Sequence, residues 1–332
     1  MVPHILPLLN RSATRSLRFL ARPSTARFYS APAGPQILVT DLPAPSTGRI
    51  RILSLNRPSA RNALSRSLLA DLRAQIDEVA AEYDAEGNEI PLPKTYGGVA
   101  GPNERGRTRA LILSSEVETC FCAGADLKER AGMSREETDA FLANLRNTFS
   151  ALAALPIPTI AAVSSMALGG GLELALCAHL RVFASTAIVG LPETRLGIIP
   201  GAGGTYRLPA VIGQNRARDM ILTGRRVSAP EAYFLGLADR LVEVVEEEGT
   251  KEGEEDKGLL KRAGKEALSE AVRLAQEICS GGPVAARAAI QATAYCREEV
   301  ENKQYETVVA TEDRDEALKA FREKRLPVFK GR

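Results

Sequence analysis

Two glutamates lie near glycine-rich turns in the middle of this sequence, and together they could carry out acid–base chemistry. Glu173 follows three glycines at 169–171, and Glu193 lies in an otherwise apolar segment bounded by proline and glycine. Burial would raise the pKa of Glu193 toward neutrality. Two carboxylates with separated pKa values can act as general acid and general base. The pair therefore predicts proton transfer at one site.

The glycines at 169–171 could bring backbone N–H groups to the same place. An apolar run at 157–163 predicts a buried strand, and an apolar helix is expected from about 170 to 178. Glycine lets the backbone approach a ligand without a Cβ in the way, and N–H groups at a helix start lack internal partners. Such donors stabilise an oxyanion or enolate. For the glycine run taken alone, a plain turn is the alternative.

A second turn suited to a ligand follows another predicted strand. Residues 109–114 are apolar enough for a buried strand, and 119–128 place small residues and backbone at its end. Ligands of α/β folds usually bind at the carboxyl ends of strands. A plain connecting loop is the alternative. Residues 84–108 are polar and rich in glycine and proline, which predicts a surface insertion.

The order of the predicted elements indicates an α/β core followed by a helical C-terminal part. Strands and helices alternate first and helices come last. A charge run at 246–257 is expected to be a solvated loop. The predicted helices with one apolar face or a helical pattern lie at about 66–83, 134–154, 202–211, 214–222, 229–235, 258–280, 283–296, 299–311 and 313–323.

The N-terminus differs from the rest of the chain. Residues 1–30 hold five arginines and no acid, which is typical of a mitochondrial transit peptide ending at Tyr29; a disordered basic tail is the alternative. Removing 1–29 takes five arginines from a net charge of +2 and leaves −3. Neither net charge is the strongly positive one that would predict nucleic-acid binding. No apolar run approaches the roughly 20 residues that cross a membrane, so no membrane insertion is expected.

Cysteine and histidine offer little to a metal or redox site. The five cysteines are an odd number in a chain of 332 residues, which argues against a disulfide framework. Cys120 and Cys122 have neither redox nor zinc spacing. The histidines are His4 and His179, and His179 lies in an apolar run, where we expect a hydrogen-bonded core residue. The sequence therefore predicts no metal site.

Three segments together resemble the crotonase (enoyl-CoA hydratase/isomerase) superfamily: 121–126, 160–175 and 192–205. The resemblance covers about 36–332. It implies an α/β fold with a crotonase-like ββα spiral core over 36–240 and a helical C-terminal trimerisation region over 241–332. In that family two backbone N–H groups hold the thioester oxygen and two glutamates act in hydratases. These catalytic positions match Ala125, Gly170, Glu173 and Glu193.

The reaction implied by this resemblance is reversible syn addition of water across the double bond of a 2-enoyl-CoA. No cofactor is expected, because coenzyme A is part of the substrate. Ala60 and Ala63 match the adenine site, while Phe321 and Lys324 match residues that cover the CoA nucleotide, often from a neighbouring subunit. Ordinary packing is the alternative for that last pair, and a structural role for Asp126. The implied substrate contacts are Ala60, Ala63, Ala123, Asp126, Leu127, Lys128, Gly169, Phe321 and Lys324.

Within the superfamily, residues 122–131, 191–194 and 321–327 resemble the mitochondrial methylglutaconyl-CoA hydratase branch. That branch acts on 3-methylglutaconyl-CoA in leucine degradation, which implies the mitochondrial matrix and a homo-oligomer, a trimer or hexamer. Some members bind AU-rich RNA through a lysine-rich helix, whereas the matching helix here has no lysine. A general short-chain hydratase of β-oxidation, an isomerase and an RNA-binding protein on this fold are the alternatives. The cation for the substrate's terminal carboxylate is left open among Lys128, Arg130, Arg135 and Arg195.

Overall fold

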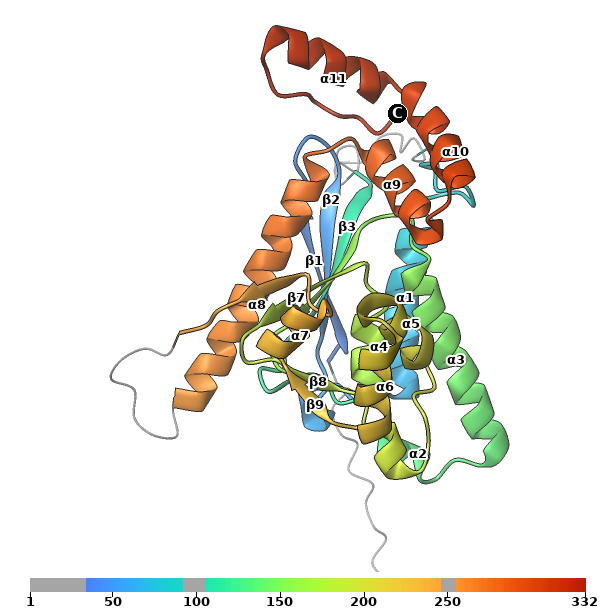
Figure 1. Ribbon diagram of the computed structural model, residues 1–332, viewed down its shortest axis with the longest axis vertical. Coiled ribbons are helices and arrows are strands. Elements are labelled where there is room, and N and C mark those ends of the chain that lie inside the picture. Colours follow the sequence, from blue (N-terminus) through green and yellow to red (C-terminus); the bar gives the residue numbers. More distant parts are fainter. Residues whose placement is uncertain (1–33, 92–105, 246–254) are drawn as a thin grey trace, which may run out of the picture. The chain divides into compact units, whose positions relative to one another are not determined.

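The computed structural model describes residues 34–91, 106–245 and 255–332, and the strands among them form two sheets (Figure 1). The predicted transit peptide at 1–29 and residues 92–105 of the predicted insertion lie outside the described residues. The larger sheet has the order β1 (Ile37–Pro43), β2 (Arg49–Leu55), β3 (Thr108–Ser115), β5 (Thr159–Val163), β7 (Leu180–Ala184) and β10 (Arg240–Val242). The smaller sheet has the order β4 (Cys120–Cys122), β6 (Met166–Leu168), β8 (Ile188–Gly190) and β9 (Arg226–Ser228).

Successive strands alternate between the two sheets, which produces a spiral. The chain passes from β3 to β4, from β5 to β6 and from β7 to β8, and neighbouring strands within each of these sets run parallel. Only the edge pairs β1–β2 and β8–β9 are antiparallel among the described strands. Each crossing places the end of one strand next to the start of another, so the turns after β4, β6 and β8 gather at one place. The predicted ββα spiral core is confirmed.

Helices cover both faces of the larger sheet. Figure 1 shows α8 along one side and α1 with α3 on the other. The helices are α1 (Arg66–Ala80), α2 (Leu127–Arg130), α3 (Arg135–Ala153), α4 (Gly170–Ala175), α5 (Gly204–Ile212), α6 (Gln214–Thr223), α7 (Ala229–Leu235), α8 (Glu255–Cys279), α9 (Pro283–Tyr295), α10 (Glu298–Val309) and α11 (Glu312–Glu323), with 3-10 turns η1 (Pro58–Ala60) and η2 (Glu193–Leu196).

Side chains along a strand point to opposite faces of the larger sheet, so the apolar core has one part on each face. On β2, Ile50 and Ile52 pack on the α8 side, while Leu53 and Leu55 belong to the core under α1 and α3. Both β2 and β3 are buried along almost their whole length, as expected for strands covered on both faces. Alanines at 263, 267, 271 and 275 repeat every four residues along α8 and are at most 1% exposed. Their small side chains let α8 lie close to the sheet.

Local capping explains where the two long helices beside the site begin. The Ser65 hydroxyl accepts a hydrogen bond from the Leu68 N–H at 3.1 Å. Ser134 and Glu137 form a capping box at the start of α3. These caps satisfy N–H groups that the helix itself leaves unpaired.

Some boundaries differ from those predicted. The charge run at 246–257 is not all loop, because α8 begins at Glu255. The helix predicted to reach 178 ends at Ala175. The strands β1, β4, β6 and β9 were not predicted. The last three have three residues each, which are few for showing a period of two.

The helical C-terminal part is joined to the sheet by packing as well as by the chain. Pro35–Arg332 form one compact unit, within which α8 contacts β3, β5 and β7. The Thr47 hydroxyl also donates a hydrogen bond to the Phe329 carbonyl at 3.2 Å. None of the described helices combines the length and the apolar character needed to cross a membrane.

Candidate active site

The glycine turn between β6 and α4 needs bare backbone for two reasons. Gly169 has φ +54°, and a Cβ there would lie 2.8 Å from Glu193 Oε1. A Cβ at Gly171 would lie 2.0 Å from the Cys122 carbonyl oxygen, which belongs to the neighbouring strand β4. A side chain at either position would push apart segments that must touch. The turn therefore brings α4 against β4 and Glu193 against the glycine run.

Glu173 is held by backbone donors from a distant loop. It lies in α4 and is 3% exposed. Its Oε1 accepts hydrogen bonds from the Ala202 and Gly204 N–H groups, both at 2.8 Å. Burial raises the pKa of Glu173 above its ordinary value, and these two hydrogen bonds oppose that rise. The carboxylate is fixed in position with one oxygen, Oε2, left for other contacts.

Glu193 is also buried, but fewer hydrogen bonds stabilise its charged form than stabilise that of Glu173. It begins η2, directly after the turn that follows β8, and is 9% exposed. Its buried Oε2 has no hydrogen-bond partner among the described residues. Burial raises the pKa of Glu193 to about 7, and the nearby charge of Glu173 adds to the rise. A carboxyl group with this pKa is ready to give or take a proton near neutral pH.

Two N–H groups adjoin the glutamates and are free to bind an oxygen. A Cβ on Gly170 would lie 3.8 Å from the Ala125 nitrogen, and one on Gly124 would lie 3.3 Å from the Gly170 nitrogen. The two N–H donors are therefore neighbours, although Ala125 lies in the turn after β4 and Gly170 follows β6. Within the described part of the chain, neither the Ala125 nor the Gly170 N–H donates a hydrogen bond. Leu64 supports the Ala125 turn by donating to the Gly124 carbonyl at 2.8 Å.

These groups line one cavity of about 960 Å³. Its volume is that of a small-molecule site. Several large apolar side chains at the cavity are more than half exposed, which is typical of a binding surface rather than of a monomer's solvated face. Of the predicted site residues, the cavity is lined by Glu173, Glu193, Ala125, Gly170, Ala123, Leu127 and Gly169. Its large apolar residues that are more than half exposed are Leu127, Leu196, Ile199 and Tyr206.

Asp126 lies beside the cavity and supports its wall. It caps α2 by accepting from the Lys128 and Glu129 N–H groups at 3.1 and 3.2 Å. It also forms an ion pair with Arg57 at 2.7 Å. Burial alone would raise the pKa of Asp126, but the Arg57 hydrogen bond and the helix N–H groups lower it overall. In this chain Asp126 therefore holds α2 and the loop before α1 together.

The remaining predicted contacts lie outside the cavity. Ala60 ends η1 and is half-buried, and Ala63 is buried next to it. Lys128 is exposed on α2. Phe321 is 84% exposed, and Lys324 is the C-cap residue that follows α11. Neither residue lines the cavity.

Sequence reasoning gave no role to the loop at 200–204, although the motif 192–205 includes it. This loop supplies both N–H groups that hold Glu173, and two arginines fasten its carbonyls. Arg146 Nε donates to the Gly201 carbonyl at 2.7 Å, and Arg207 donates to the Ala202 carbonyl at 3.0 Å. The glycines of this loop could have predicted that role, because glycine leaves backbone N–H groups accessible to a nearby carboxylate.

His179 has the role expected of a core histidine. Its Nδ1 accepts from the Thr159 N–H at 3.1 Å and lies 2.7 Å from the Thr159 hydroxyl. Burial lowers the pKa of His179. Across the described ranges, no group of three metal-ligating side chains is close enough to hold an ion.

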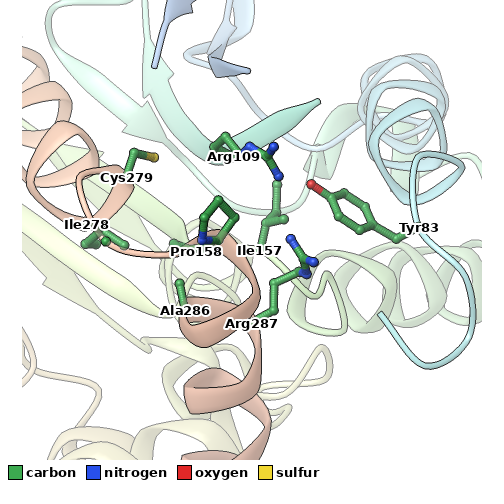
Figure 2. A pocket seen from close by; sticks show the side chains of 10 residues that line it. Tyr83, Arg109, Ile157, Pro158, Ile278, Cys279, Ala286 and Arg287 are labelled. Atoms are coloured by element: carbon green, nitrogen blue, oxygen red, sulfur yellow. The ribbon is translucent and has the colours of Figure 1, made fainter. Parts of the chain in front are cut away.

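A second cavity, shown in Figure 2, is too small for a substrate. Its volume is about 10 Å³, which holds about one water. Tyr83 donates to the Thr108 carbonyl at 2.5 Å, and Arg109 and Arg287 both pair with Glu89. The hydrogen bond and ion pairs occupy the polar groups of these side chains, so this cluster joins the sheet to α9 and does not form a substrate site.

Known proteins that are similar to this chain point to one family. Residues 103–332 match the enoyl-CoA hydratase/isomerase family. The chain is 62% identical to methylglutaconyl-CoA hydratase 1, mitochondrial, of Pyricularia oryzae, over 100% of this chain and 99% of that protein. It is 40% identical to human enoyl-CoA hydratase domain-containing protein 2, mitochondrial, over 91% and 92% of the two chains.

A solved structure supports the same assignment. The crystal structure of enoyl-CoA hydratase from Bacillus anthracis superposes with a TM-score of 0.71 at 37% sequence identity, covering 90% of this chain and 100% of that one. The family match spans more than half of the chain, and the paired glutamates and free N–H groups lie inside it. The chain therefore belongs to the enoyl-CoA hydratase/isomerase family, as its resemblance to the crotonase superfamily predicted.

Proposed function

We propose that this protein is a mitochondrial hydratase that adds water syn across the double bond of 3-methylglutaconyl-CoA. The observation that carries the proposal is one cavity lined by two buried carboxylates, Glu173 and Glu193, and by the free N–H groups of Ala125 and Gly170. The 62% identical relative named methylglutaconyl-CoA hydratase supports the choice of substrate.

In the proposed reaction, the thioester carbonyl oxygen accepts hydrogen bonds from the Ala125 and Gly170 N–H groups. These donors stabilise the enolate oxygen that forms when water attacks Cβ. Glu173 takes a proton from the water, and the C–O bond forms as the double bond shifts toward the thioester. Glu193 then delivers a proton to Cα, which restores the thioester and completes the addition on one face.

The environments of the two glutamates support this division of roles. Glu193, with a pKa of about 7, can be protonated when the substrate binds and can therefore donate. Glu173 accepts two backbone hydrogen bonds that favour its ionised form, which suits a base. Water bound between them would donate a hydrogen bond to the ionised Glu173 carboxylate and accept one from the protonated Glu193 carboxyl group. No cofactor enters these steps, because coenzyme A is carried by the substrate.

Location and assembly follow as part of the proposal. The names of two relatives include "mitochondrial". Together with the arginine-rich, acid-free N-terminus, they support residues 1–29 as a transit peptide and the matrix as destination. We propose a homo-oligomer, a trimer or hexamer, in which Phe321 and Lys324 of one subunit cover the CoA nucleotide bound to another. The 84% exposure of Phe321 on α11 supports a partner at that position.

RNA binding through α1 is not favoured. Arg66 lies within 4 Å of the carboxylates of Glu129 and Glu137, and Arg73 pairs with Asp77 at 2.7 Å. Paired arginines contribute less to phosphate binding than free ones, because an acid already occupies them. Filter binding of AU-rich RNA at physiological salt tests this point, and tight binding would reverse it.

The deciding test compares hydration of 3-methylglutaconyl-CoA and crotonyl-CoA by loss of the conjugated thioester absorbance. We expect kcat/KM to favour 3-methylglutaconyl-CoA strongly. A preference for crotonyl-CoA would instead make this a general short-chain hydratase of β-oxidation. Failure to hydrate either, with turnover of a 3-enoyl-CoA, would favour an isomerase; a 53% identical relative from Zymoseptoria tritici is named enoyl-CoA isomerase/hydratase. Near-normal hydration by both Glu173→Gln and Glu193→Gln would contradict the mechanism.

A further inference from the structure

Four cations could meet a carboxylate at the far end of the acyl group, and the structure separates them. Lys128 and Arg135 are exposed and do not line the active-site cavity. Arg195 donates its Nε to the Thr223 carbonyl at 2.7 Å and does not line the cavity either. Arg130 is the member of this set that lines it.

Arg130 is half-buried and has no acidic partner among the described residues. Its neighbours differ, because Arg57 pairs with Asp126 and Arg66 lies near Glu129. Among the described residues no carboxylate balances the charge of the Arg130 guanidinium, which leaves that charge available to a ligand. It presents a planar set of donors that matches a carboxylate. Such a group at the wall of an apolar cavity indicates an anionic part of the ligand.

The position of Arg130 fits a short dicarboxylic acyl chain. Arg130 follows the N–H donor Ala125 by five residues and ends α2, which is a single turn rising about 5.4 Å. The two carboxyl carbons of an extended five-carbon diacid lie about 5 Å apart at ordinary bond lengths. With its thioester oxygen on Ala125, such an acyl group would extend over about the length of α2.

We propose that Arg130 binds the terminal carboxylate of the acyl group and makes this site select dicarboxylic acyl-CoA thioesters. This inference deepens the proposed function and rests on it for the substrate. Leu142 and Leu145 of α3 line the same cavity and supply its apolar wall. Arg146 also lines it, but its Nε is bound to the Gly201 carbonyl, so we assign it to positioning the loop at 200–204.

Binding of two unreactive thioesters tests Arg130 independently of hydration. Glutaryl-CoA and butyryl-CoA differ by the terminal carboxylate alone, and their Kd values are measured by calorimetry on the full chain. In Arg130→Gln we expect glutaryl-CoA to bind about 10- to 100-fold more weakly, the value of a hydrogen-bonded ionic contact. The Kd of butyryl-CoA should change less than about threefold, as neutral contacts are retained. Arg130→Lys keeps the charge but loses the planar guanidinium that can donate two hydrogen bonds to one carboxylate. Its Kd for glutaryl-CoA should lie between those of wild type and Arg130→Gln.

Two further variants make the test specific. Arg135→Gln removes an exposed arginine from the same segment and should leave both Kd values unchanged. Arg146→Gln examines the other cavity arginine, and thermal unfolding checks that every variant is folded. A glutaryl-CoA preference that survives in Arg130→Gln, or that is lost only in Arg146→Gln, would overturn the inference. A wild-type protein that binds the two ligands equally would overturn it as well.

The same variants separate this inference from the proposed function. If glutaryl-CoA binding depends on Arg130 but 3-methylglutaconyl-CoA is not hydrated, the carboxylate site stands and the hydratase proposal fails. If hydration of 3-methylglutaconyl-CoA is efficient and unaffected by Arg130→Gln, the proposed function stands and the assignment of Arg130 fails.

Discussion

Replacing Glu193 with glutamine should stabilise the fold, and the gain should grow with pH. Burial raises the pKa of Glu193 from its ordinary value of 4.5 to about 7. The folded state therefore binds this proton more tightly than the unfolded chain does. The tighter proton binding stabilises the wild-type fold fully below about pH 4.5, and this stabilisation is lost as the pH rises through about 7. Glutamine has a similar shape and no charge, so the variant avoids that loss.

The size of the effect follows from the two pKa values. Their difference corresponds to a cost of about 3 kcal/mol for the ionised side chain at pH well above 7. About 2.5 kcal/mol of this develops between pH 5 and pH 8, since the unfolded carboxyl group is mostly ionised throughout this range while the folded one stays largely protonated until the pH nears 7. Other titrating groups are common to both proteins and cancel in the difference.

Urea unfolding at pH 5, 6.5 and 8, at one protein concentration, measures this difference directly. The free energy of unfolding of Glu193→Gln minus that of wild type should rise steadily across the series. Glu173→Gln serves as the matched control and should gain less, because two N–H groups already compensate the Glu173 carboxylate. A difference for Glu193→Gln that does not change with pH would refute the reasoning. So would a larger pH-dependent gain in the control.

Three other outcomes follow from the same contacts. Glu173→Gln should lower kcat by about 10²- to 10⁴-fold in the hydration assay while leaving KM nearly unchanged, as expected for a lost general base; unchanged kcat would remove Glu173 from the mechanism. Gly171→Ala should destabilise the fold by about 1–3 kcal/mol or more in urea unfolding, because its Cβ would meet the Cys122 carbonyl oxygen at 2.0 Å, and wild-type stability would contradict that packing. Native protein should react with one equivalent of a thiol reagent, at Cys296, since the other four cysteines are buried; labelling of all five before unfolding would show that the core opens.

Short-range features of the chain were predictable from the sequence. The helix starts at Ser65 and Ser134 follow from their hydroxyl caps and the apolar faces beyond them. The buried strands β3 and β5 follow from continuous apolar runs. The resemblance to the crotonase superfamily, which rests on three motifs, added the spiral arrangement. In the second sheet, β8 was predicted at its observed bounds, whereas β4, β6 and β9 were missed.

The sequence by itself determined which chemical groups are present and what their local turns permit. Two glutamates, two glycine-bearing turns and a choice of four cations could be named in advance because these depend on residue type and on spacing within a few residues. Only the tertiary structure decided how these groups meet. Glu173 and Glu193 are twenty residues apart in the chain, and the donors that fix Glu173 come from 202–204, beyond both. The raised pKa of Glu193 and the position of Arg130 on the cavity wall arise from burial and from the spiral that brings strand ends together, and neither burial nor such contacts are properties of neighbouring residues in sequence.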